Sequence, residues 1–260
     1  MATGAEARAA QCPVCSGLAP ALPPVDFNKS CEDREQPLLP PSGQGISYCL
    51  CARCGFCFAP AMHAWSREDF ARQVYNDAYA IVDPDYLGAR PEGNAGALHA
   101  LLGGHAARIR HLDFGGGDGL LARLLRGQGW QSESWDPFLE PDRDLTRLGR
   151  FALVTAYEVF EHVPDVDHLI RTLGRITERQ GIVLFSTLLC DGQVKAGEPP
   201  SWWYAAPRNG HISLFSRRSL EILGQRAGFR YHGIDHLTHV YWRQSPRWAC
   251  EVFGLPKSKR

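Results

Sequence analysis

The sequence predicts an α/β fold with a mostly parallel open sheet, preceded by a small cysteine-rich head. Three observations lead to this fold class. From about residue 106 onward, apolar strand patterns alternate with segments of helical period. A glycine-rich turn at 115–119 joins one of these strands to the next helix. Seven of the nine cysteines lie before residue 58. We therefore expect a head at 1–60, a helical bridge or lid at 61–105 and the main α/β domain at 106–260.

Composition narrows the kinds of binding partner and the cellular location that we expect for this protein. A chain of 260 residues can bury one good core and a small accessory domain, and its formal net charge is zero. Neutral charge gives no strong electrostatic case for a nucleic-acid partner. The longest apolar candidate, 182–190, is far shorter than a membrane span. We expect a soluble, cytoplasmic protein with no membrane partner, and the sequence leaves its oligomeric state open.

The cysteines of the head have the spacing of a metal site. Two Cys-x-x-Cys knuckles can supply four thiolates to a tetrahedral Zn²⁺ ion, and they consist of Cys12, Cys15, Cys51 and Cys54. The segment between the two knuckles is longer than usual and Pro-rich, so we expect it to form a loop. Three neighbouring cysteines are alternative ligands, namely Cys31, Cys49 and Cys57. Free core thiols and a redox pair are the other interpretations. A structural zinc ion would stabilise a segment too small to fold by burial alone.

The bridge begins with a helix start signal. Ser66 is the expected N-cap, and acidic residues follow in the first turn. Three tyrosines then follow in an Asp-rich stretch, at Tyr75, Tyr79 and Tyr86. They either line a site as part of a lid or pack the bridge onto the main domain.

The glycine-rich turn indicates a ligand that lies directly on the backbone. Asp113 ends a short apolar run, and glycines follow at alternate positions, Gly115, Gly117 and Gly119. Glycine permits positive φ and close approach of a ligand, and the helix beyond the turn offers free N–H groups. The spacing excludes a dinucleotide fingerprint, whose last glycine would fall at Leu120, and the Lys and Ser/Thr of a P-loop are absent. A plain glycine-rich surface turn is the alternative.

Two motifs resemble those of one enzyme family. The pattern Asp-x-Gly-x-Gly-x-Gly resembles motif I of the class I S-adenosylmethionine (SAM)-dependent methyltransferases. The run 157–165, YEVFEHVPD, resembles the end of the fourth strand in the branch that includes ubiquinone-biosynthesis O-methyltransferases. The head is similar to zinc-binding heads that precede some SAM methyltransferase domains, including certain sugar C-methyltransferases. The resemblance implies a Rossmann-like class I methyltransferase sheet, ending in an antiparallel hairpin, with SAM as cofactor.

The resemblance also implies roles for single residues. Asp113 and the three glycines would bind SAM, and Asp136, at the end of the second strand, would hold the ribose hydroxyls. Tyr157 and Glu158 would contact the cofactor, and the Glu161–His162 pair would lie beside the acceptor pocket. The family usually reads adenine with an acidic residue in the next segment, which is short here, and Asp144 is the candidate. A plain turn aspartate is the alternative for Asp136.

The rest of the domain continues the alternation. A buried strand is expected at 151–157, a helix at 166–176 and a strand at 181–187. An aromatic-rich excursion follows, with Trp202, Trp203, Tyr204, Arg208, Asn209 and His211. It forms either a cap over an acceptor pocket or a structural loop core. A helix from 216 to 228 and two strands, 229–237 and 240–248, complete the sheet.

The predicted reaction is methyl transfer to an O, N or C nucleophile. An acceptor that must lose a proton needs a base with a pKa near neutrality, and His162 and His211 are the candidates; a structural histidine is the alternative for each. A small-molecule or sugar-type acceptor is the leading hypothesis. An RNA or protein methyltransferase that docks its substrate through the zinc head, and a non-catalytic SAM-binding module, are the other two.

Overall fold

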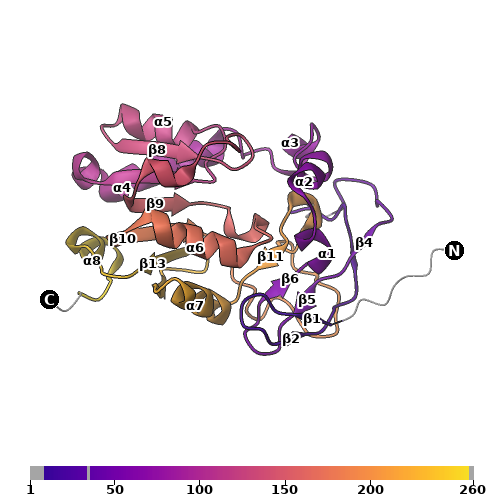
Figure 1. The fold of residues 1–260 in the computed structure, drawn as a ribbon. Helices are drawn as coiled ribbons and strands as arrows, with labels where there is room; N and C mark the ends of the chain where they lie inside the picture. The colour runs from indigo at the N-terminus through magenta and orange to yellow at the C-terminus, as the bar shows by residue number, and fades with distance from the viewer. Residues whose placement is uncertain (1–8, 34–35, 258–260) are drawn as a thin grey trace. The chain divides into compact units, whose positions relative to one another are not determined.

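A computed structural model describes residues 9–33 and 36–257 of the chain (Figure 1). The first eight residues of the predicted head lie outside these ranges. The chain divides into two compact units. We call them the cysteine unit (Met1–Pro84, Glu161–Asp167 and Leu188–Ile222) and the sheet unit (Asp85–Phe160, His168–Thr187 and Leu223–Arg260). The predicted boundaries at 1–60, 61–105 and 106–260 stay a prediction. No helix in the described ranges is both long enough and apolar enough to cross a bilayer.

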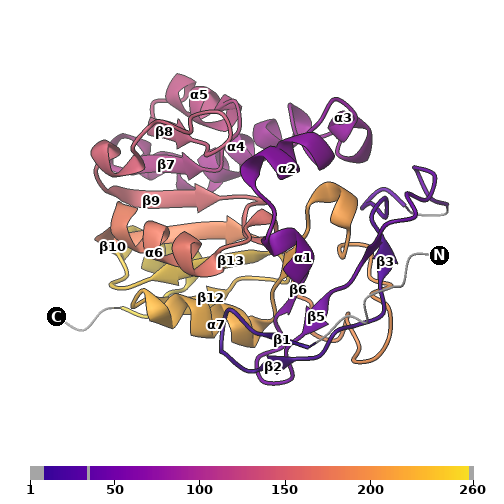
Figure 2. The same ribbon diagram turned by 45° about the vertical axis from the view of Figure 1, so that its right-hand side comes forward.

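The sheet unit is built on six strands in the order β12-β13-β10-β9-β7-β8, which Figure 2 displays in one view. The strands are β7 (Arg110–Phe114), β8 (Gln131–Trp135), β9 (Phe151–Ala156), β10 (Thr177–Ser186), β12 (Arg230–Gly233) and β13 (Thr238–Trp242). The pairs β7–β8, β7–β9 and β9–β10 are parallel, whereas β13 runs antiparallel to β10 and β12. The predicted fold class, a mostly parallel sheet with an antiparallel C-terminal hairpin, is confirmed.

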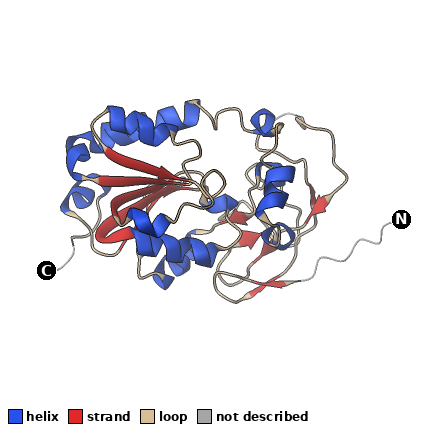
Figure 3. Ribbon diagram, turned by 45° about the horizontal axis from the view of Figure 1, so that its top comes forward, coloured by secondary structure: helices blue, strands red, loops and turns tan. Residues whose placement is uncertain are grey.

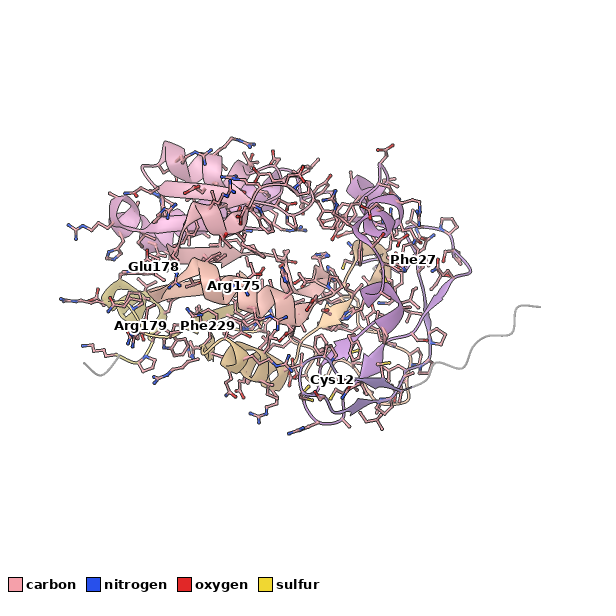
Figure 4. The ribbon with its side chains drawn as sticks, viewed as in Figure 1. Cys12, Phe27, Arg175, Glu178, Arg179 and Phe229 are labelled. Atoms are coloured by element: carbon pink, nitrogen blue, oxygen red, sulfur yellow. The ribbon has the colours of Figure 1, made fainter. Side chains whose placement is uncertain are left out.

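Helices cover both faces of this sheet (Figure 3). They include α4 (Ala89–Leu102), α5 (Leu120–Gly127), α6 (Val166–Ile176) and α8 (Arg247–Phe253), with the short 3₁₀ turns η1 (Gly103–Arg108) and η2 (Leu145–Leu148). A further helix, α7 (Arg217–Arg226), begins in the cysteine unit and ends in the sheet unit. Apolar side chains of α4, α5 and α8 form one buried cluster with strand residues such as Leu153 and Ile182. Beside β13, the ring of Phe229, labelled in Figure 4, stacks on Tyr241 with centroids 5.6 Å apart.

The end of the chain differs from the prediction in one element. The strand expected at 240–248 ends at Trp242, and α8 begins at Arg247 with Pro246 as its N-cap. Proline lacks the N–H that a strand ladder needs, and its fixed φ suits the start of a helix. The sheet therefore ends earlier than predicted, and the helix was missed.

The cysteine unit contains short strands and helices. Its strands are β1 (Ala10–Gln11), β2 (Leu18–Ala19), β3 (Val25–Asp26), β4 (Gly45–Ile46), β5 (Cys49–Leu50), β6 (Cys57–Phe58) and β11 (Ser213–Leu214). They pair as β1-β2, β3-β4 and β11-β6-β5. The helical elements are α1 (Pro60–His63), α2 (Arg67–Gln73), α3 (Tyr79–Val82) and η4 (Pro207–Asn209), and the turn η3 (Phe160–His162) begins in the sheet unit.

The predicted start of α2 is confirmed. Ser66 Oγ accepts a hydrogen bond from Asp69 N at 3.1 Å, and Ser66 N donates to Asp69 Oδ2 at 3.0 Å. This reciprocal capping box satisfies two backbone donors at the helix end. The unit's core includes Tyr48, Met62 and Tyr204, each at most 2% exposed.

Candidate functional site

The glycine turn lies between β7 and α5 in the sheet unit. Gly115, Gly117 and Gly119 have φ of 72°, 54° and 79°, a region that L side chains avoid. A Cβ on Gly115 would lie 2.6 Å from Val159 Cγ2. Backbone conformation therefore favours glycine at all three positions, and contact with Val159 adds a steric reason at Gly115. Gly117 is exposed where the sequence predicted a ligand.

Two polar side chains pack against the backbone of the turn at Gly116. A Cβ on Gly116 would lie 2.4 Å from both Asp113 Oδ2 and Ser134 Oγ. Ser134 Oγ is buried, and no partner for it is present in the described ranges. Buried hydroxyl groups are normally hydrogen-bonded. The residues present therefore fit a polar cofactor group that approaches the backbone at Gly116.

The carboxylate of Asp136 lies across the turn. Its Oδ2 accepts from Gly117 N at 3.1 Å, and its Oδ1 accepts from Phe138 N at 2.8 Å and Leu139 N at 3.2 Å. Asp136 is half-buried. The structure thus brings Asp136 to the motif turn, and its two oxygens retain lone pairs for further donors.

Asp113 is the buried acid of the site, with 4% exposure. Thr155 Oγ1 donates to its Oδ1 at 2.9 Å. Burial raises the pKa of Asp113 to about 7, and the negative charge of Asp136 acts in the same direction, whereas the Thr155 hydrogen bond lowers it. The Asp113 carboxyl therefore titrates near neutral pH, where its protonated and ionised forms are both present.

Tyr157 and Glu158 follow the carboxyl end of β9. Glu158 has a left-handed φ of 52°, and its backbone N donates to Ser186 Oγ at 2.8 Å. Ser186 Oγ in turn donates to Glu158 Oε1 at 2.7 Å, so this serine fixes the Glu158 side chain. Burial raises the pKa of the Tyr157 hydroxyl, which keeps it protonated at neutral pH. The sheet unit therefore contains all seven residues predicted to bind the cofactor.

Asp144, the candidate for adenine recognition, lies at the start of the turn η2. Its Oδ1 accepts from Thr146 N at 2.9 Å and from Thr146 Oγ1 at 2.6 Å, so it is the N-cap of η2. The structure thus gives this side chain a local capping role.

The four predicted zinc ligands meet in the cysteine unit. Their Sγ atoms all lie within 4.8 Å of one another, and Figure 4 labels Cys12 in this region, where sulfur atoms gather. The Cys12–Cys54 Sγ distance is 3.6 Å and the Cys15–Cys51 distance is 3.4 Å. A tetrahedral zinc ion with Zn–S bonds of about 2.3 Å places its sulfur ligands roughly 3.8 Å apart. The geometry of the four cysteines therefore fits the ion.

Local structure explains why these four cysteines converge. Each knuckle closes with a tight backbone turn, in which Ser16 N donates to Cys12 O at 2.8 Å and Gly55 N donates to Cys51 O at 2.9 Å. The hydrogen bond from Cys54 lowers the pKa of Cys12 to about 5, which favours a thiolate there. The three alternative ligands, Cys31, Cys49 and Cys57, are not members of this cluster.

The two candidate bases also come together in the cysteine unit. The rings of His162 and His211 lie 4.9 Å apart, and Glu161 joins them in a group whose donor atoms lie within 4.8 Å of one another. His211 Nδ1 is 2.8 Å from the carbonyl oxygen of Tyr204. A carbonyl only accepts, so Nδ1 carries a hydrogen and Nε2 is the basic nitrogen of a neutral ring. These three side chains are also a donor set that suits a divalent cation.

Two tyrosines support this group. Tyr204 OH donates to Glu161 Oε1 at 2.5 Å, and Glu161 is fully buried. Tyr75 OH lies 3.3 Å from His162 Nδ1. Of the other bridge tyrosines, Tyr79 is buried and donates to Asp83, whereas Tyr86 belongs to the sheet unit and is 38% exposed.

The aromatic excursion is an ordered part of the cysteine unit. Arg208 is buried, and its guanidinium donates to Val74 O at 2.9 Å and to Asn76 Oδ1 at 3.0 Å. Asn209 Nδ2 donates to Val82 O at 2.8 Å. Trp203 is half exposed, whereas Tyr204 is 2% exposed. The excursion therefore folds against the 74–82 segment, as the structural-loop interpretation describes.

Several polar residues of the sheet unit were missed from the sequence. His111, Ser132, Thr155 and Ser186 are buried and bonded to the predicted site or to one another. The one feature of the sequence that could have pointed to these residues is that they are polar residues inside strands. Nothing in the sequence shows which partners they meet.

Comparison with known proteins now identifies the family. Residues 86–233, more than half of the chain, match the model of a methyltransferase domain. The chain belongs to the methyltransferase domain family. The matched range contains every predicted cofactor residue, from Asp113 within β7 to Glu158 just beyond β9.

One curated relative and several solved structures are similar to this methyltransferase chain. The ubiquinone biosynthesis O-methyltransferase of Azorhizobium caulinodans is 32% identical over a match that covers 43% of this chain. The chain spans 64% of that relative's length. Magnesium protoporphyrin IX methyltransferase from Synechocystis PCC 6803 with bound SAH is 15% identical, with a TM-score of 0.42, covering 67% of this chain and 95% of the other. The 1,6-didemethyltoxoflavin-N1-methyltransferase of Burkholderia thailandensis is 16% identical, with a TM-score of 0.43, covering 73% and 94%.

Proposed function

We propose that this protein is a SAM-dependent methyltransferase that methylates an O, N or C nucleophile of a small molecule or sugar-type biosynthetic intermediate. One observation carries the proposal. Within the matched methyltransferase domain, the Asp136 carboxylate accepts a hydrogen bond from Gly117 in the motif turn. The name of the curated relative concerns ubiquinone biosynthesis. That name supports a small-molecule acceptor over an RNA or a protein.

Cofactor binding is assigned to the sheet unit. The backbone of the turn receives the cofactor at Gly117, which is exposed and has nothing within 4 Å of its Cβ position. Gly115 and Gly119 supply left-handed backbone conformations on either side of it. Asp136 accepts from the ribose hydroxyls with its remaining lone pairs, a charge-assisted and directional contact. Asp113 supplies a buried negative charge, and Tyr157 and Glu158 line the neighbouring strand end.

When bound, SAM supplies an activated methyl group on a sulfonium, which a nucleophile displaces in line. The residues of the protein then hold the methyl donor and the acceptor at near-attack distance, and they remove the proton from an acceptor whose nucleophilic atom carries one. We assign proton removal to His211 or His162. His211 is the better oriented of the two, because the Tyr204 carbonyl holds its Nδ1 hydrogen and leaves Nε2 basic.

The cysteine cluster is assigned a structural Zn²⁺ ion. Two of the sulfur–sulfur distances, 3.6 Å and 3.4 Å, are close to the roughly 3.8 Å of a tetrahedral site, and the four cysteines would supply a complete ligand set with no open position. A closed site stabilises its surroundings and takes no part in chemistry.

Calorimetry on the purified full chain tests the cofactor assignment. We expect heat of binding from SAM and from its demethylated product and none from NAD. Asp136→Asn should weaken SAM binding about tenfold or more, since a hydrogen bond to a charged group contributes about 1.5–3 kcal/mol. Asp142→Asn, at an exposed aspartate outside the predicted site, is the matched control and should bind SAM like the wild type. Binding of NAD without binding of SAM would end the proposal.

Methyl transfer from labelled SAM to a panel of hydroxylated, amino and acidic-carbon acceptors tests the reaction. His211→Ala and His162→Ala should retain SAM binding, and the variant that lacks the base should lose at least 100-fold in turnover. Unchanged turnover in both variants would exclude both histidines as the base.

A further inference from the structure

A line of buried polar side chains runs across three adjacent strands beneath the glycine turn. Ser132 on β8 lies opposite His111 on β7, and Thr155 on β9 lies opposite Asp113. Ser132 Oγ is 2.8 Å from His111 Nδ1, and His111 Nε2 is 2.9 Å from Thr155 Oγ1. Thr155 Oγ1 is 2.9 Å from Asp113 Oδ1. His111 and Thr155 are fully buried, and Ser132 is 3% exposed.

The chemistry of each group sets the direction of these hydrogen bonds when Asp113 is ionised. A carboxylate only accepts, so the Thr155 hydroxyl donates to Asp113. The Thr155 oxygen then accepts from His111, which places the imidazole hydrogen on Nε2. Burial lowers the pKa of His111 to about 3, so the ring is neutral and carries a single hydrogen. Its Nδ1 therefore accepts from the Ser132 hydroxyl.

This inference rests on the proposed function and goes further into its cofactor site. We propose that Thr155 and His111 are positioning residues that hold the Asp113 carboxylate as the fixed counter-charge for the cationic cofactor, through a one-way chain of hydrogen bonds that starts at Ser132. Neither side chain needs to touch the cofactor. Their effect reaches it through the orientation and charge of Asp113.

The surroundings of Asp113 show why such support is needed. Asp136 at the end of β8 is a like charge, and Tyr157 beyond β9 is a neutral phenol. Burial opposes ionisation of Asp113, and the Thr155 hydroxyl is the one side-chain donor recorded to its carboxyl in the described ranges. Removal of that hydroxyl should therefore make Asp113 harder to ionise, and SAM should bind tightly only at higher pH.

The pH profile of SAM affinity tests this inference. For the wild type, we expect the Kd to rise as the pH falls below about 7, by at most about tenfold per pH unit. Thr155→Val keeps the shape of the side chain and removes its hydroxyl. This change should raise the midpoint of the pH profile of SAM affinity by about one pH unit and weaken SAM binding about tenfold at pH 7. Thr155→Ser restores the hydroxyl and should restore the wild-type profile. A Thr155→Val profile identical to the wild type would overturn the inference, whatever its melting temperature.

Two further measurements act at His111. His111→Leu should shift the midpoint in the same direction by less, and His111→Gln, which offers an N–H near the Nε2 position, should recover part of the shift. Nitrogen-15 NMR of the wild-type SAM complex should show the Nε2–H tautomer for His111, and the Nδ1–H tautomer would overturn the inference without any variant. Wild-type protein that fails to bind SAM even at pH 8.5 overturns the proposed function together with the inference. Normal wild-type binding with unshifted variants overturns the inference alone.

Discussion

The two units of this chain solve the problem of stability in different ways. The sheet unit has a six-stranded sheet covered by helices on both faces, with long buried strands such as β9 and β10. Two-residue strands and helices of four to seven residues predominate in the cysteine unit, which gathers four thiols at one point. Burial along long strands holds the sheet unit together, whereas the cysteine unit combines a buried core with a proposed metal cross-link. Stability and cofactor chemistry should therefore respond to different treatments in the two units.

Metal removal gives the largest expected effect. Structural zinc contributes apparent free energies on the order of 10 kcal/mol in small zinc domains. A Cys51→Ser substitution, or a strong chelator, should unfold the cysteine unit and release one zinc ion per chain, measured by elemental analysis and thermal unfolding. Cys250→Ser in α8 is the matched control, because that cysteine is not a member of the cluster. Full loss of zinc with no change in the unfolding temperature would show that a metal ion does not stabilise the cysteine unit.

The buried acid of the sheet unit gives the second effect. The folded-state pKa of Asp113 is raised to about 7, above an unfolded value of about 3.9. The folded state therefore binds the extra proton, and its contribution to stability is present below about pH 4 and is lost as the pH rises toward 7. Asp113→Asn should be more stable than the wild type at pH 8 by up to about 4 kcal/mol in the absence of cofactor.

This advantage of Asp113→Asn should shrink as the pH falls to 4, and the variant should bind SAM poorly. Chemical denaturation at several pH values measures the difference. A constant gap between the two proteins from pH 4 to 8 would show that Asp113 does not titrate as described.

The glycine turn gives the third effect, and it should be confined to the cofactor. Gly116→Ala places a Cβ within 2.4 Å of Asp113 Oδ2 and Ser134 Oγ, so the turn must shift. SAM binding should weaken at least 100-fold, about 3 kcal/mol, by calorimetry. Gly127→Ala, at the end of α5 with nothing within 4 Å, should bind SAM normally. Equal losses of SAM affinity in both variants would mean that the glycine turn does not bind the cofactor.

The smallest effect tests local structure in the cysteine unit. Ser66→Ala removes the cap of α2 and should cost about 1 kcal/mol of unfolding free energy. Ser66→Asp keeps a capping oxygen and should lose much less. SAM binding should be unchanged in both variants. A large change in the Kd for SAM would show that local stability of the cysteine unit and cofactor binding in the sheet unit are not independent.

Patterns of short range were predicted well from the sequence. The turn at 115–119 and the two cysteine knuckles depend on residues a few positions apart, so spacing alone identifies them. The cap at Ser66 is equally local. The mostly parallel sheet followed from the alternation of strands and helices, and the antiparallel hairpin followed from the family resemblance, whereas the order of the strands was not predicted.

Features that depend on tertiary packing could not be read in the same way. The helix α4 contains Pro91, Gly93 and Gly96, which are weak helix formers, and it is held by burial of residues such as Leu98 and Leu102. Thr155 and His111 are polar residues in buried strands, and their partners come from neighbouring strands. Sequence shows that such residues are unusual, but only the register of β7, β8 and β9 shows what they contact.

The segment between the two cysteine knuckles is anchored at its middle as well as at its ends. Lys29 Nζ donates to the carbonyl oxygens of Trp202 and Ala205 at 2.7 Å, and Cys31 N donates to Asn209 Oδ1 at 2.8 Å. Because these bonds fix the backbone at residues 29 and 31, changes at the exposed positions of the segment should leave the two cysteine knuckles in place. This segment is therefore the natural place to graft new sequence when this scaffold is re-engineered, provided that Lys29 and Cys31 keep their bonds.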